Sequence, residues 1–247
     1  GLTPAQVVGL EAVFFSGFWV MWELPSGWIA DKIGHARSIQ LSGPFAALGF
    51  GQYGLSDQFW QFCIMELLIG IAQGLLSGSD VALLHESLSA TNRADEESSW
   101  QHRIMAASKR SYMIGALGSI AIVHWFGVAA TLIVDALIIL IGIPILFRLT
   151  EVYSGAQRTG NFRETLRAFM GNFEVRAFMQ LSIGISIITY FAVWLTAIYY
   201  QQLGITVLAV GLISFFKQFA MLRLSKWMKL RRFQYRHWWW LTGIAIA

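Results

Sequence analysis

The sequence is divided into apolar stretches of about 20 residues, and this division constrains the fold more than any other feature. The complete stretches cover roughly residues 7–30, 38–55, 60–88, 104–123, 127–147, 177–200 and 205–224. A helix of about 20 residues crosses the hydrocarbon core of a bilayer. A backbone in lipid must satisfy its own hydrogen bonds, which leaves only helices and closed β-barrels. The strands of a β-barrel are about ten residues long and alternate apolar with polar residues, and these stretches do neither. The sequence therefore predicts an all-α polytopic membrane protein with seven full transmembrane helices.

The two ends of the chain look incomplete. An eighth apolar stretch begins near His237 and is still running at Ala247, so we expect the start of an eighth transmembrane helix. The chain opens on Gly1 rather than Met, and residues 1–24 lack the charged region and cleavage site of a signal peptide.

The composition agrees with a membrane protein. Hydrophobic residues make up 56% of the chain and charged residues only 13%, whereas soluble domains have about 25% charged residues. So little charge cannot cover a soluble globule, which excludes a soluble domain, a disordered chain and a nucleic-acid-binding module. A single cysteine, Cys63, excludes a disulfide scaffold and a cysteine-based metal site.

The basic residues predict the orientation of the chain. Seventeen of the eighteen Lys and Arg residues lie in alternate connections or at the adjoining helix ends, and the other connections contain none. Positively charged loops remain in the cytoplasm, so we expect a multi-pass protein of the cytoplasmic (inner) membrane. The loops predicted to be cytoplasmic are 31–37, 89–103, 148–176 and 225–236.

The longest of these loops, 148–176, follows the fifth stretch. The segment from Asn161 to Phe178, which begins in this loop and ends just after it, places apolar and aromatic residues among charged ones. This pattern is typical of an amphipathic helix that lies at the membrane interface. A plain linker helix between two bundles explains the same pattern.

Three short motifs carry a resemblance to a known family. The first cytoplasmic turn reads G-W-I-A-D-K-I-G-H-A-R over residues 27–37, and E-L-P-S-G precedes it at residues 23–27. Residues 77–87 read S-G-S-D-V-A-L-L-H-E-S. These runs resemble the G-x-x-x-D-R/K-x-G-R-R/K and E-x-P-S-G motifs of the major facilitator superfamily (MFS), and an S-G-x-D-x-A-L-L-Y-D-S stretch of some of its permeases.

The resemblance implies an incomplete MFS fold, covering about helices 2 to 9 of twelve. Residues 1–147 would then be helices 2–6 of the N-terminal half, 148–176 the central cytoplasmic loop, and 177–247 part of the C-terminal half, helices 7–9. The implied function is secondary active transport by a symporter or antiporter. Multidrug antiport is disfavoured, because the helix-4 R-x-x-x-G and helix-5 G-P-x-x-G-G motifs of those antiporters are absent from residues 70–74 and 115–118.

The first motif suggests a conformational latch. Asp31 lies at a tight turn between Gly27 and Gly34, where a carboxylate can pair with Arg37 and with the positive end of a helix dipole. Glu86, predicted at the same depth, would complete the cluster, or would be a solvated interfacial side chain. The alternative for Lys32 and Arg37 is a simple topology signal.

Ionisable groups within the predicted helices are candidates for proton coupling or substrate binding, because charges in lipid are costly. These candidates are Glu23, Asp80, Lys217, Glu66 and Asp135. Function and structural pairing are equally compatible with Glu23 and Asp80, whereas a structural role is favoured for Glu66 and Asp135. Tyr190 and Trp194, one turn apart, are candidates to line a cavity, although packing explains them better.

No cofactor is predicted. The histidines lack metal-ligand spacing, and no G-x-x-x-x-G-K-S/T loop is present for nucleotide binding. The expected partners are a small-molecule substrate, a coupling proton and the lipid bilayer, without nucleic acid. The alternatives to transport are an integral-membrane scaffold or receptor, or a lipid-modifying protein, for which no catalytic constellation is visible.

Overall fold

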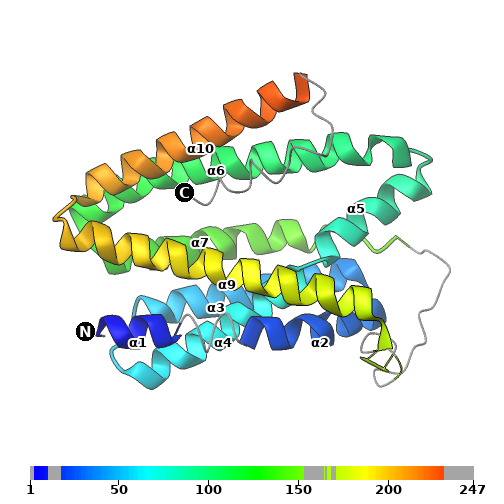
Figure 1. Ribbon diagram of the computed structural model, residues 1–247, viewed down its shortest axis with the longest axis horizontal. Helices are drawn as coiled ribbons and strands as arrows, with labels where there is room; N and C mark the ends of the chain where they lie inside the picture. The colour runs from blue at the N-terminus through cyan, green and yellow to red at the C-terminus, as the bar shows by residue number, and fades with distance from the viewer. Residues whose placement is uncertain (1–2, 11–17, 153–163, 165, 168–170, 231–247) are drawn as a thin grey trace. The chain divides into compact units, whose positions relative to one another are not determined.

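The structure is a computed structural model that describes residues 3–10, 18–152, 164, 166–167 and 171–230. Within these ranges every regular element is a helix and there is no strand, which confirms the predicted all-α class for this part of the chain (Figure 1). The elements are α1 (Pro4–Gly9), α2 (Phe18–Ile33), α3 (His35–Tyr53), α4 (Phe59–Leu76), α5 (Ser79–Ala90), the 3-10 turn η2 (Ala94–Glu96), α6 (Glu97–Phe126), α7 (Val128–Leu146), α9 (Phe173–Gln202) and α10 (Val207–Leu230).

Three segments are long and apolar enough to cross a membrane. They are Phe59–Ala90, which combines α4 and α5, Val128–Leu146 and Val207–Leu224. Each coincides with one of the seven predicted crossings, and the other four crossings stay predictions. The described part of α2 has 16 residues, fewer than the roughly 20 that a crossing needs.

The predicted stretch 60–88 is interrupted in the structure. α4 ends at Leu76 and α5 begins at Ser79, and Gly78 between them has a left-handed φ of 75°. Glycine adopts this conformation without steric cost, which explains why the break between α4 and α5 falls at Gly78. The carbonyl of Leu75 accepts a 2.6 Å hydrogen bond from the hydroxyl of the fully buried Ser38 on α3. The end of α4 is therefore attached to α3.

The connections are shorter than predicted, because helices extend into them. Gly34 alone separates α2 from α3, α6 already begins at Glu97, and α10 continues to Leu230. In the predicted amphipathic helix at 161–178, residues 161–163, 165 and 168–170 lie outside the described residues, and α9 already begins at Phe173. The stretch from His237 also lies outside the described residues.

The first compact unit contains residues 1–97 and 128–191, and α3 is its central helix. α3 packs most extensively on α4 and α7. At Gly49 a Cβ atom would lie 2.6 Å from Cγ1 of Ile69 on α4, and at Gly43 it would lie 2.9 Å from Cδ1 of Leu146 on α7. Small residues thus allow close helix packing on both sides of α3.

The second compact unit contains residues 98–127 and 192–247. α6 and α10 lie side by side in it (Figure 1), and a Cβ atom on Gly211 would lie 2.5 Å from Cγ1 of Ile120. Large apolar side chains remain exposed on both helices, for example Ile114 and Phe216. Exposed apolar surface of this kind marks contacts with a membrane or a partner. The division into two transporter halves at 148–176 stays a prediction.

Candidate functional site

The α2–α3 junction is the most elaborate arrangement of polar groups among the described residues. Gly34 connects the two helices with φ 99° and ψ 149°, a backbone conformation available almost only to glycine. A Cβ atom on Gly34 would also lie 2.5 Å from Oε2 of Glu151. Both the backbone conformation and the approach of the carboxylate therefore require glycine here.

Glu151 caps the N-terminus of α3 from a distant part of the sequence. The backbone N–H groups of His35 and Ala36 donate hydrogen bonds to Oε1 and Oε2 of Glu151, each with an N···O distance of 2.8 Å. The first N–H groups of a helix have no partner within the helix, and they attract negative charge. The carboxylate thus satisfies two of these groups and ties the segment after α7 to α3.

Further contacts hold the junction together. Nε2 of His35 lies 3.7 Å from the carboxylate of Glu86 on α5, and both side chains are largely buried. The side-chain amide of Gln40 donates to the carbonyl of Leu149 at 2.9 Å. A small core lies beside these polar groups and consists of Ala36, Ile39, Leu83, Leu146, Leu149 and Val152. The junction therefore joins α3, α5 and the end of α7.

The structure places the predicted latch residues around this junction. Glu86 contacts His35, and Gly34 forms the connection itself. Asp31, Lys32 and Arg37 are exposed, and the ammonium of Lys32 lies 4.1 Å from the ring centroid of Trp28. Gly27 has no neighbour within 4 Å of its potential Cβ position.

Sequence reasoning missed the two residues that organise the junction, Glu151 and His35. The available signal was an acidic residue in the segment that follows α7, in a loop otherwise rich in Arg, together with a helix that begins after glycine. The pairing joins residues more than a hundred positions apart, so no local pattern reveals it.

The two leading coupling candidates, Glu23 on α2 and Asp80 on α5, both lie near the break between α4 and α5. Oε1 of Glu23 accepts a 2.7 Å hydrogen bond from the hydroxyl of Ser77. Asp80 lies in the first turn of α5, where Oδ1 accepts the N–H of Val81 at 2.8 Å. Both residues are exposed in the structure.

The remaining ionisable candidates differ sharply in burial. Glu66 on α4 is 4% exposed and hydrogen-bonds with the side chain of Tyr53. Asp135 on α7 and Lys217 on α10 are exposed. Among these three, Glu66 alone is enclosed by protein.

The connection from α5 to α6 carries exposed polar contacts. Nδ1 of His85 lies 2.8 Å from a carboxylate oxygen of Glu97. Arg93 donates two hydrogen bonds to Glu96, and this contact raises the pKa of the Arg93 guanidinium. In the part of the chain that the structure describes, no group of three or more His, Cys, Asp or Glu residues is arranged to hold a metal ion.

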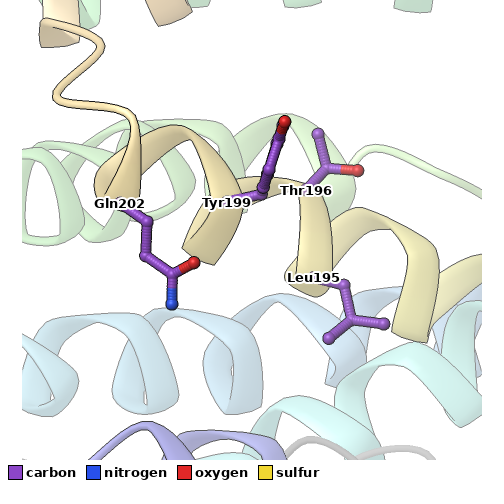
Figure 2. Close-up of a pocket in the computed structure, with 4 residues that line it drawn as sticks. All are labelled: Leu195, Thr196, Tyr199 and Gln202. Carbon is purple, nitrogen blue, oxygen red and sulfur yellow. The ribbon is translucent and has the colours of Figure 1, made fainter.

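An open hollow lies along α9, lined by Leu195, Thr196, Tyr199 and Gln202. Figure 2 shows Thr196 and Tyr199 next to each other, with Leu195 and Gln202 directed away from them. The side chains of the predicted cavity residues, Tyr190 and Trp194, lie outside the described part of the structure. Four residues of one helix do not enclose a ligand, so this hollow is not a complete site.

Comparison with known protein families, curated proteins and solved structures finds no match to this chain.

Proposed function

We propose that this chain belongs to a secondary active transporter of the MFS type, which moves a small molecule across the cytoplasmic membrane by proton-coupled alternating access. The observation that carries the proposal is the α2–α3 junction. There the G-x-x-x-D-K-x-G run ends in a glycine whose conformation brings the Glu151 carboxylate onto the N-terminus of α3. The three apolar helices add support, because transport requires a membrane-spanning bundle. No chemical catalysis is proposed for the chain.

The junction has the properties of a conformational latch. Its two carboxylate hydrogen bonds form only when α3 and the segment after α7 lie together, so they stabilise the closed arrangement of these helix ends. In alternating access one helix bundle rocks against the other largely as a rigid body, so a contact such as this one is made in one state and broken in the other. Substrate then shifts the balance between the two arrangements by its difference in affinity for them.

Solute flux tests the proposal directly. The full protein is reconstituted in liposomes that contain a pH-sensitive dye, and sugars, amino acids, organic cations and organic anions are added in turn under an imposed pH gradient. We expect one class to change the internal pH and to accumulate. A folded, inserted protein that neither accumulates nor exchanges any of these solutes would contradict the proposal.

A substitution at the latch provides the matching prediction. Glu151→Gln keeps the shape of the side chain but removes its charge from the α3 N-terminus. The loss of about 1 kcal/mol from the closed junction should slow solute transport about fivefold at equal expression. Glu164→Gln removes an exposed carboxylate elsewhere and serves as the control. Equal transport rates in both variants would reject the latch.

A further inference from the structure

The carboxyl group of Glu66 is buried within the apolar segment Phe59–Ala90, with only 4% of the residue exposed. The other carboxylates predicted to lie within membrane helices, Glu23, Asp80 and Asp135, are all exposed. Burial therefore separates Glu66 from the other three carboxylate candidates, including Glu23 and Asp80, which the sequence favours.

Glu66 lies in the interface between α3 and α4. Its side chain hydrogen-bonds with Tyr53, the last residue of α3. The ring of Tyr53 packs edge-on against Phe62, one turn before Glu66, with 5.1 Å between ring centroids. Met65 and Ile69, on either side of Glu66 in α4, are also buried. The carboxyl group thus has one hydroxyl partner and otherwise apolar surroundings.

The charged groups on the elements packed against α4 lie elsewhere. On α3, Arg37 is 16 residues before Tyr53, about 24 Å along the helix, and His35 is further away. On α2, Glu23 reaches Ser77 at the far end of α4, and Asp31 and Lys32 follow it by two turns or more. The titratable groups of α5 begin at Asp80, beyond the break. On α4 itself the neighbour is Cys63, a thiol.

Within the described residues, no basic side chain therefore faces Glu66. An ionised carboxylate enclosed in apolar protein is strongly disfavoured unless a cation pairs with it. A neutral carboxylic acid needs no such partner, and its carbonyl oxygen can accept a hydrogen bond from the hydroxyl of Tyr53. Burial without a facing cation therefore favours the protonated acid over the carboxylate.

We propose that Glu66 and Tyr53 form a proton-binding site and that Glu66 carries the coupling proton of the transporter, an assignment that rests on the proposed function. In this assignment the acid is neutral while the site is closed, as it is in the structure. When α3 and α4 separate at Tyr53, the O–H bond of the Glu66 carboxyl breaks, the proton passes to water, and the carboxylate is left solvated. Rebinding of a proton from water restores the neutral acid before the site closes.

Infrared difference spectroscopy of the reconstituted protein tests the proton site, with the proton itself as the probe. Spectra recorded across a pH titration, in H₂O and in D₂O, should contain the carbonyl stretching band of a buried protonated carboxylic acid. The band should be lost in Glu66→Gln and retained in Asp57→Asn, a matched change of an exposed loop carboxylate. A band of equal intensity in Glu66→Gln would overturn the proposal.

A second variant keeps the test decisive if Glu66→Gln does not fold. Tyr53→Phe removes the hydroxyl but keeps the ring against Phe62, so the acid band should remain and move to higher frequency. An unshifted band, or no acid band in the folded parent protein, would equally overturn the site.

The coupling role of Glu66 is tested by a separate measurement, the proton flux that accompanies solute transport. This measurement can contradict the coupling role without contradicting the proposed transport function. With a solute class that the parent protein transports, Glu66→Gln should lose solute-driven proton flux and pH-driven accumulation but retain solute exchange. Unchanged proton flux in Glu66→Gln would overturn the coupling role alone. If the parent protein transports no solute while the acid band is present, the proposed function and the coupling role both fail, and the proton site remains.

Discussion

A single glycine, Gly34, determines whether the α2–α3 junction can form. Its positive φ disfavours every other residue, and the space where a Cβ atom would lie is filled by the Glu151 carboxylate. Backbone strain and steric conflict therefore act at the same residue. The final glycine of the G-x-x-x-D-K-x-G motif is therefore required both by its backbone conformation and by the space that the carboxylate occupies.

We predict that Gly34→Ala destabilises the protein by about 1–3 kcal/mol, the usual cost of a glycine-only backbone conformation in another residue. The free energy of unfolding in detergent, from a denaturant titration, measures this change. Gly27→Ala is the control, since Gly27 lies within α2 with open space around it and alanine favours helix formation. Equal stability of Gly34→Ala and the parent would show that the junction is not closed in solution.

At the scale of helices, α3 and α4 are joined by close backbone approach at Gly49 and by the hydrogen bond from Ser38 to Leu75. Because the buried pair Glu66 and Tyr53 lies in the same interface, the separation of these helices determines how well the site excludes water. Helix packing and the proposed proton site are therefore coupled.

We predict that Gly49→Ala costs about 1–3 kcal/mol, as expected for overpacking of a close interface, because its Cβ atom would lie 2.6 Å from Ile69. Gly51→Ala in the same helix is the control, since its nearest contact would be an ordinary 3.4 Å to Ala136. Thermal melting of the three proteins in detergent provides the comparison. The double variant Gly49→Ala/Ile69→Ala should cost less than the sum of its single changes, and strict additivity would contradict a direct clash.

At the scale of the whole molecule, the unequal distribution of Lys and Arg predicts how the chain is oriented in the membrane. The loops 56–59 and 201–206 contain no basic residue, so they are predicted to face away from the cytoplasm. The single native cysteine makes this orientation easy to test.

We predict that cysteines introduced at Asp57 and Gln202, in a Cys63→Ser background, react with a membrane-impermeant reagent on intact cells. A cysteine at Arg93 should react only after the cells are opened, because this residue lies in the opposite set of loops. Both Asp57 and Gln202 are exposed, so burial does not prevent labelling. The reverse pattern would mean that the orientation is inverted.

The sequence by itself determined the class of this protein. Apolar stretches of membrane-crossing length predict helices, because an unpaired backbone is not tolerated in lipid. Gly34 also indicates a tight turn, because glycine is the residue that most readily adopts a positive φ in a short connection. The break at Gly78 was not foreseen, because the apolar pattern continues through it and the αL conformation leaves no periodic signal.

Only the tertiary structure decided which residues meet. Glu151 and His35 are unremarkable in the sequence, and they become the centre of the junction because α3 packs between α7 and α5. Glu66 resembles the other acidic residues of the apolar stretches until its burial beside Tyr53 distinguishes it. Periodicity reports the faces of one helix at a time, whereas burial and pairing depend on neighbours that are far apart in the chain.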